Sequence, residues 1–237
     1  MKFRIHHKDT TVSTNLDARA GAPGDVYTAS EQTGGRGRLD HRWLSPPGKN
    51  LMMSVVLDVE GMEPAQVSTF PLMVGLAVRD ALVRFLGTSR VGGGVMLKWP
   101  NDVLVDGRKL AGILCESNDG KVIAGIGVNV NQVEFDPEIA ERATSLAKLR
   151  GMASVDMVRD AVLEALAKRY ADWRAKGFLY QHADYYEVDA LRGRQLVVKQ
   201  TDNDPNPIAG RCDGVMPDGT LLVAGRSIWA GEAHVLS

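Results

Sequence analysis

The chain has 237 residues, of which 44% are hydrophobic and 24% are charged, and its formal net charge at pH 7 is −1. This composition is typical of a globular protein with a sizeable core and excludes a disordered chain. The near-zero net charge also excludes a global basic field that would draw the protein onto nucleic acid, so any anion must be bound locally.

The two cysteines, Cys115 and Cys212, lie far apart and match no metal-ligand spacing. We therefore expect reduced thiols and no cysteine-bound metal. No apolar run is long enough for a signal peptide or a membrane span, so we expect a cytoplasmic protein without membrane contact. Only a dozen residues precede Ser13, and we expect no separate DNA-reading module and no DNA partner.

The first half of the chain alternates helix and strand patterns. A short helix is predicted at residues 13–20 and a strand at 26–32, which leads into a glycine- and arginine-rich loop. A buried strand is predicted at 50–59, and a helix at 64–87 from the spacing of its apolar residues.

Short turns dominate the middle of the chain. The hairpin signals at 106–107 and 118–120 separate strands predicted at 103–105, 110–116 and 121–130, after a first strand at 95–99. These strands form an antiparallel meander. An amphipathic helix is predicted at 154–176, and a second short helix follows through Val188.

The sequence changes in character at Asp189, where short strand patterns are separated by Asp, Asn, Pro and Gly turns. We predict an α+β domain with a mixed sheet and flanking helices over residues 1–188. Residues 189–237 are predicted to form a small β barrel, which is too small to be robust alone and is expected to pack on the larger domain.

Three polar clusters are candidates for one site. The first, at 34–43 (GGRGRLDHRW), combines glycines with cations and suits an anion, although a solvated basic loop is an alternative. The second joins Lys98–Asp102 to Arg108–Ile113, and the third is GIGVNVN at 125–131. On a strand of period two, Asn129 and Asn131 would share a face, and a plain solvated surface is again the alternative.

These residues match a known family in order. Ser13-Thr14-Asn15, Gln32, GGRGR, KWPNDV, RKLAGI and GIGVNVN follow one another along nearly the whole chain. In these motifs the chain resembles the biotin protein ligases (biotin–[acetyl-CoA-carboxylase] ligases). The resemblance implies a fold like that of class II aminoacyl-tRNA synthetases with an SH3-like C-terminal domain. It also implies the catalytic-only class, because the helix-turn-helix of the repressor-type members is missing.

The resemblance implies a ligase that forms a carbon–nitrogen bond in two steps. Biotin reacts with ATP, accompanied by Mg²⁺, to give biotinyl-5′-AMP, and a lysine of the biotin carboxyl carrier protein then takes the biotinyl group. The implied catalytic residues are Arg36, Asp102 and Lys109. The implied biotin-binding residues are Ser13, Thr14, Asn15, Gln32, Arg36, Gly37, Arg38, Lys109 and Gly112. The implied nucleotide-binding residues are Arg36, Arg38, Trp43, Lys98, Asn101, Lys109, Asn129 and Asn131.

The residue types suit this chemistry. A carboxylate that approaches a triphosphate meets about 4 kcal/mol of repulsion per charge pair at 4 Å and an effective dielectric of about 20, which Arg36, Arg38 and Lys109 can offset. Trp43 either stacks on adenine or anchors the loop. Asp102 either helps to deprotonate the acceptor lysine, holds Lys98 or holds a magnesium ion.

Several points stay open at this stage. Many relatives carry glycine where this chain has Asp40, and we hypothesise that Asp40 tempers the charge of the loop. The alternatives to a biotin ligase are a lipoate- or octanoyl-transferring relative, which lacks the combined motifs, and a non-enzymatic biotin sensor or nucleic-acid-binding protein. The metal position is unknown, and an edge strand could form a homodimer or stay free.

Overall fold

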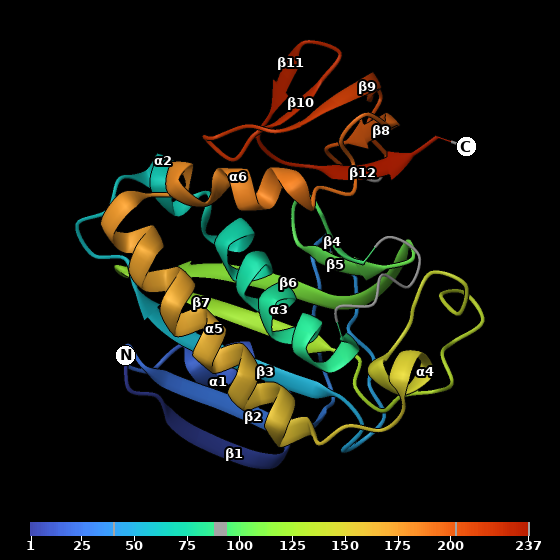
Figure 1. Ribbon diagram of the computed structural model, residues 1–237. Helices are drawn as coiled ribbons and strands as arrows, with labels where there is room; N and C mark the ends of the chain where they lie inside the picture. The colour runs from blue at the N-terminus through green and yellow to red at the C-terminus, as the bar shows by residue number, and fades with distance from the viewer. Residues whose placement is uncertain (40, 88–93, 202, 237) are drawn as a thin grey trace.

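A computed structural model describes residues 1–39, 41–87, 94–201 and 203–236 (Figure 1). Helices and strands mix in it around a seven-stranded sheet and a separate five-stranded sheet. The predicted α+β class, with a mixed sheet, flanking helices and a small C-terminal β unit, is therefore confirmed.

The large sheet has the strand order β1-β2-β3-β7-β6-β5-β4. The edge strand β1 runs parallel to β2, and every other neighbouring pair is antiparallel. The sheet is therefore mixed, as predicted. Its strands are β1 (Arg4–Thr11), β2 (Asp25–Gln32), β3 (Leu51–Asp58), β4 (Val95–Lys98), β5 (Asp102–Val105), β6 (Arg108–Asn118) and β7 (Lys121–Val128).

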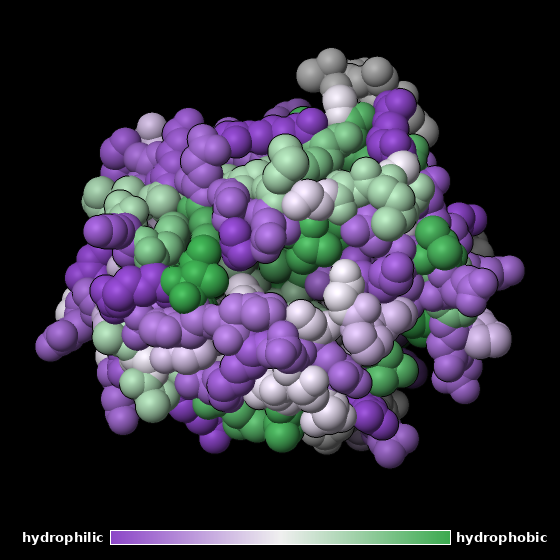
Figure 2. Space-filling model, turned by 90° about the horizontal axis from the view of Figure 1, so that it is seen from below, coloured by the Kyte–Doolittle hydropathy of each residue, from purple (hydrophilic) through white to green (hydrophobic). Residues whose placement is uncertain are grey.

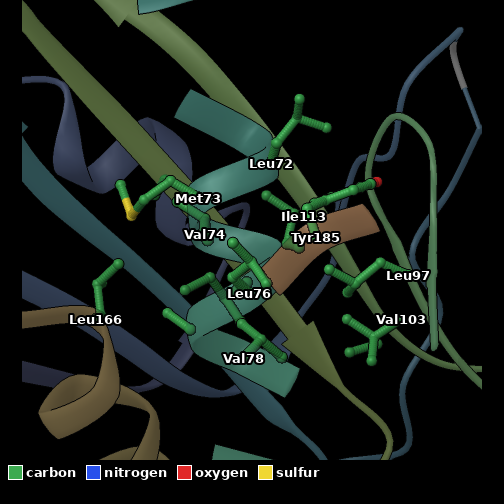
Figure 3. Close-up of a cluster of buried hydrophobic side chains, with 14 of the residues drawn as sticks. Leu72, Met73, Val74, Leu76, Val78, Leu97, Val103, Ile113, Leu166 and Tyr185 are labelled. Atoms are coloured by element: carbon green, nitrogen blue, oxygen red, sulfur yellow. The ribbon is translucent and has the colours of Figure 1, made fainter. Parts of the chain in front are cut away.

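Helices cover one face of this sheet and leave most of the other face to the polar clusters. The long helices α3 (Phe70–Leu86) and α5 (Val155–Lys176) pack on each other and on the sheet, with α6 (Leu179–Glu187) beside them (Figure 1). Figure 3 shows α3 side chains such as Leu76 meeting Leu97 of β4 and Ile113 of β6. The remaining helices are short: α1 (Thr14–Ala18), α2 (Pro64–Val67) and α4 (Leu146–Arg150).

The short helix α1 lies on the opposite face, against β2, β3 and β7. There Ala18 packs on Val56 and Ile123, separately from the main core. Because side chains alternate along a strand, every second residue of β3, β6 and β7 turns toward α1. Three cross-strand rows result from the pairing register: Met52–Gly127–Gly112, Ser54–Gly125–Leu114 and Val56–Ile123–Glu116.

The five-stranded antiparallel sheet has the order β11-β10-β9-β8-β12 and lies above β4 and α6 in Figure 1. It contacts the larger unit through hydrogen bonds, since the Trp99 indole donates to Gly219 O over 3.1 Å and His182 Nε2 lies 2.7 Å from Val215 O. Its strands are β8 (Gln195–Lys199), β9 (Ile208–Val215), β10 (Leu221–Val223), β11 (Arg226–Ile228) and β12 (Glu232–Val235).

Some predicted elements differ from the structure. The helix expected at 64–87 is two helices, and Pro71 lies in the first turn of the second, where its missing N–H costs nothing. The strand expected at 121–130 ends at Val128. The edge strand β1 was not predicted, because residues 4–10 are all exposed and show no apolar alternation. The short α4 and β12 were also not predicted.

The free edge of the large sheet is hydrophilic. Strand β1 lies at the bottom of Figure 1, and Figure 2 shows that hydrophilic residues cover most of the molecule seen from below, with hydrophobic residues in separate patches. Within the described residues, no helix has the length and apolar character that crossing a bilayer requires.

Candidate active site

A cavity of about 120 Å³ lies between the α1 side of the sheet and the loop at residues 34–43. All of the predicted site residues line this cavity except Asn129 and Asn131. The structure thus brings together side chains from the N-terminus, the arginine loop and the meander, and residue Glu232 of β12 joins them. The predicted residues at the cavity are Ser13, Thr14, Asn15, Gln32, Arg36, Gly37, Arg38, Trp43, Lys98, Asn101, Asp102, Lys109 and Gly112.

Glycines form the floor of the cavity, and the Trp43 indole lies directly on it. A Cβ added at Gly127 would stand 2.5 Å from Trp43 Cε2, and one added at Gly112 would stand 3.1 Å from Trp43 Cζ3. These two glycines pair across β6 and β7, so only residues without side chains leave room for the ring. The Trp43 Nε1 atom is buried and has no hydrogen-bond partner among the described residues.

The loop over the cavity is an irregular hairpin. Arg36 and Arg42 form an antiparallel bridge, and Trp43 N donates to Gly35 O over 3.0 Å. A Cβ at Gly35 would lie only 2.5 Å from Trp43 O, so this closure requires glycine. The hypothesis about Asp40 concerns a residue outside the described part of the chain.

The two arginines of the loop are held by different parts of the molecule. Arg36 Nη2 lies 3.1 Å from Glu116 Oε1 on β6. Arg38 Nη1 donates to Gly231 O of the small β unit over 3.1 Å. Burial lowers the pKa of the Arg38 guanidinium, while the carboxylates of Asp102 and Glu232 act in the opposite direction. A partly buried cation at this position favours an anion beside it.

The meander contributes a pair of opposite charges. Lys109 Nζ lies 2.6 Å from Asp102 Oδ1 and 5.9 Å from the centroid of the Trp43 ring. Asp102 is therefore paired with Lys109, a partner absent from the three predicted roles of this carboxylate. The Asn101 amide donates to Ile113 O over 2.8 Å, so it fixes the loop between β4 and β5 although it also lines the cavity.

Buried polar side chains close the other end of the cavity. Thr14 N donates to Gln32 Oε1 over 2.7 Å. Ser54 Oγ lies 2.7 Å from Thr14 Oγ1 and 2.6 Å from Asn15 Oδ1. Ser13, Thr14, Asn15 and Ser54 are at most 4% exposed. Within the described residues the Ser13 hydroxyl makes no side-chain hydrogen bond, which leaves it available to a ligand.

The structure does not bring Asn129 and Asn131 to the cavity. Both follow the end of β7, so the alternation expected for a strand does not apply to them. Asn129 Nδ2 donates to Thr144 O over 3.0 Å, and the Asn131 amide exchanges two hydrogen bonds with the backbone of Ala153. Both amides tie down the segment that leads to α4 and α5.

Three polar residues at this site were not predicted. Ser54 and Glu116 lie on strands β3 and β6 and contact Asn15, while Glu232 reaches the cavity from the small β unit. A signal existed for Ser54, because it is the one hydroxyl within the apolar run LMMSVVL. Glu116 follows Gly112 and Leu114 at the two-residue spacing of one strand face. Nothing in the local sequence marks Glu232.

Comparisons with known proteins agree on one family. Residues 4–132 match the family model "Biotin/lipoate A/B protein ligase family". The biotin–[acetyl-CoA-carboxylase] ligase of Paracoccus denitrificans is 31% identical over 91% of this chain and 92% of its own. The enzyme of that name from Mycobacterium tuberculosis is 39% identical over 69% of this chain and 63% of its own.

Solved structures agree as well. The biotin protein ligase from Aquifex aeolicus in complex with biotin and ATP superposes with a TM-score of 0.85 and 28% identity, covering 98% of each chain. The matches span under two thirds of the Mycobacterium relative and about half of two bifunctional ligase/repressor relatives from Bacillus. The chain belongs to the biotin/lipoate A/B protein ligase family, in its biotin protein ligase group.

Proposed function

We propose that this protein activates biotin with ATP to biotinyl-5′-AMP and transfers the biotinyl group to a lysine of a biotin carboxyl carrier protein. The observation that carries the proposal is the cavity that joins a buried hydroxyl and amide cluster to the cations of the loop and the meander. One end suits a neutral polar ring, and the other suits an anion.

The hydroxyl and amide end would bind the ureido ring of biotin. Gln32 Oε1 accepts from Thr14 N, so the Gln32 amide nitrogen is free to donate to the ureido carbonyl together with the Ser13 hydroxyl. A lipoyl ring has no groups for these partners, and buried polar groups left unpaired would reject it strongly.

The cationic end would hold the carboxylate and the α-phosphate. Arg36, Arg38 and Lys109 reduce the repulsion between the two anions before reaction and stabilise charge that develops on the phosphate. Lys109 is held in place by Asp102. Once the adenylate forms, the loop of residues 34–43 would keep water from the mixed anhydride until the acceptor lysine arrives.

Trp43 and Lys98 are proposed to contact the nucleotide, since both line the cavity on the side of the loop and the meander. Mg²⁺ would arrive with ATP. Within the described residues no cluster of three His, Cys, Asp or Glu side chains is arranged to hold an ion. Asp102 and Glu232 are carboxylates at the cavity, and phosphate oxygens would supply most of the remaining ligands.

The test is pyrophosphate release from ATP and Mg²⁺ with biotin or lipoate, followed by mass spectrometry of an added biotin carboxyl carrier protein. We expect release with biotin alone, and a carrier heavier by one biotinyl group. Release with lipoate only, or with neither acid, would contradict the proposal.

Homodimerisation through an edge strand stays a prediction, which light scattering of the ligand-free and biotin-bound protein would test.

A further inference from the structure

A continuous chain of hydrogen bonds runs behind the cavity from Glu116 to Thr14. Asn15 Nδ2 donates to Glu116 Oε2 over 2.5 Å and to Leu114 O over 3.3 Å. Asn15 Oδ1 lies 2.6 Å from Ser54 Oγ, which lies 2.7 Å from Thr14 Oγ1. Thr14 is therefore the last member of a chain that joins Thr14 and Asn15 of α1 to Ser54 of β3 and Glu116 of β6.

The orientation of the Asn15 amide is fixed by its neighbours. An ionised carboxylate and a backbone carbonyl accept hydrogen bonds and cannot donate them. The nitrogen of the amide must therefore face Glu116 and Leu114, and its oxygen must face Ser54. The amide packs flat on the sheet, because a Cβ at Gly125 would stand 2.3 Å from Asn15 Oδ1.

Each of the two hydroxyl groups has one proton to donate, and this fixes which atom donates in each hydrogen bond. Asn15 Oδ1 can only accept, so Ser54 Oγ must donate its proton to it across the 2.6 Å contact. Thr14 Oγ1 must then donate its proton to Ser54 Oγ across the 2.7 Å contact. The contact from Thr14 Oγ1 to Gln32 Oε1 is longer, at 3.1 Å, and that oxygen already accepts from Thr14 N. The reverse direction would leave two oxygens 2.6 Å apart without a proton.

We propose that Glu116 and Ser54 are positioning residues that make Thr14 Oγ1 a hydrogen-bond acceptor toward the cavity. The Thr14 proton points to Ser54, away from the ligand, so the oxygen presents lone pairs to the cavity it lines. The ligand group that matches is a donor such as an N–H. Built on the proposed function, this assigns to Thr14 one ureido N–H of biotin.

Glu116 also contacts the arginine loop, which gives the relay a second role. Its Oε1 atom lies 3.1 Å from Arg36 Nη2 and 3.8 Å from Arg19 Nη2. One carboxylate thus orients the ureido end of the cavity with one oxygen and holds the loop with the other. The orientation of Thr14 and the position of Arg36 therefore both depend on Glu116.

The experiment measures biotin, desthiobiotin and ATP binding to Ser54→Ala, Thr14→Val and the double variant by calorimetry. We expect Ser54→Ala to raise the Kd of biotin about tenfold, which corresponds to about 1.4 kcal/mol. Desthiobiotin keeps the ureido group, so its Kd should rise by the same factor, while the Kd of ATP should not change. In the Thr14→Val background, Ser54→Ala should have no further effect on biotin.

Glu116→Gln is the second probe. Its amide can offer Asn15 a donor as well as an acceptor, so the Asn15 amide is free to turn over. We expect a rise of about threefold in the Kd of biotin, because Leu114 O still favours the native orientation. Ser117→Ala, at an exposed serine of the same strand, serves as the control and should leave every Kd unchanged.

Three results would overturn the proposal. The first is a biotin Kd for Ser54→Ala within twofold of the wild-type value. The second is additive effects of Ser54→Ala and Thr14→Val on that Kd. The third is an equal rise in the Kd of biotin and of ATP, which would indicate a general loss of structure. A wild-type chain that does not bind biotin would overturn the proposed function and this assignment together. A wild-type chain that forms the adenylate while Ser54→Ala behaves like it would overturn the relay alone.

Discussion

Lys109 contacts both the meander, through Asp102, and the arginine loop, through Trp43. Its ammonium group lies 2.6 Å from Asp102 Oδ1 and 5.9 Å from the centroid of the Trp43 ring, and the residue lines the cavity. Because the side chain is fixed before any anion arrives, it can stabilise phosphate charge without reorganisation. Replacing Lys109 should therefore change the rate of adenylate formation more than the free energy of unfolding.

Lys109→Ala should reduce adenylate formation by on the order of a hundredfold, the usual cost of one preorganised donor. The loss in free energy of unfolding should be smaller than the rise in the activation barrier, because the Lys109 side chain is 37% exposed and its partner Asp102 is 18% exposed. Pyrophosphate release and urea denaturation measure the two effects. Lys176→Ala, which breaks an exposed pair with Asp172, is the control. Normal turnover in Lys109→Ala would remove this lysine from the site.

Asp25 gives the fold a predictable response to acid. Burial raises the pKa of its carboxyl group, but hydrogen bonds from Ala22 N, His6 and Arg4 outweigh burial and hold the pKa at about 2. Since the unfolded value is 3.8, the unfolded chain binds more protons between these values. The stabilisation is complete above about pH 4 and is lost as the pH falls through about 2.

Asp25→Asn should therefore be less stable than wild type at pH 7, and the difference should shrink toward zero as the pH falls from 4 to 2. Urea denaturation at several pH values measures it. A difference that is the same at pH 7 and pH 2 would show that the carboxylate charge is not the cause.

Most of the residues predicted for the site line the cavity, and they were named because cations, glycines and hydroxyls stand out in motifs. Sequence reasoning did not find Ser54 and Glu116, whose roles arise when β3, β6 and β7 align and bring both to Asn15. It also placed Asn129 and Asn131 on one face of a strand, although the strand β7 ends at Val128. Motif chemistry shows which residue types are needed, whereas the register of the sheet decides which of them meet.

At the scale of elements, the loop at 34–43 depends on close backbone approach. Gly35→Ala would place a Cβ 2.5 Å from Trp43 O, so the hairpin must open. We expect a several-fold rise in the KM of biotin and ATP and faster release of the adenylate. Trypsin should also cut faster after the loop arginines.

The free energy of unfolding should fall by about 1–3 kcal/mol in Gly35→Ala, because Gly35 is buried and its added Cβ would overlap Trp43 O. Gly48→Ala is a useful contrast. Its φ of +68° strains any side chain, yet nothing lies within 4 Å of the added Cβ. That variant should lose about 1 kcal/mol of stability and keep its KM values. Unchanged KM values in Gly35→Ala would show that the loop closes without this contact.

Element prediction succeeded where burial dictates pattern and failed where partners are distant. The strand β3 was found because it is a continuous apolar run, and the helix α5 because its apolar residues recur at helical spacing. The polar edge strand β1 has no such pattern. It is held in the sheet by its pairing with β2 and by hydrogen bonds from Lys8 and Thr11 to Asp17 of α1. A strand stabilised mainly by its neighbour leaves little trace in its own sequence.

For the whole molecule, the small β unit completes the site rather than merely following it. Gly231 O accepts from Arg38, 193 residues earlier in the chain, and the next residue, Glu232, lines the cavity. The Trp99 indole, which is 2% exposed, donates to Gly219 O. Trp99 of the KWPND motif therefore holds the small β unit against the larger one.

Trp99→Phe keeps an aromatic ring but leaves the carbonyl of the half-buried Gly219 without its donor. We expect the free energy of unfolding to fall by about 1–2 kcal/mol, from the lost hydrogen bond and the smaller ring. Because Gly231 and Glu232 would be held less firmly, the KM of ATP should rise as well. Trp229→Phe is the matched control, since Trp229 is 63% exposed, and it should change neither quantity. Lower stability with an unchanged KM would mean that docking of the β unit supports the fold without shaping the nucleotide end of the cavity.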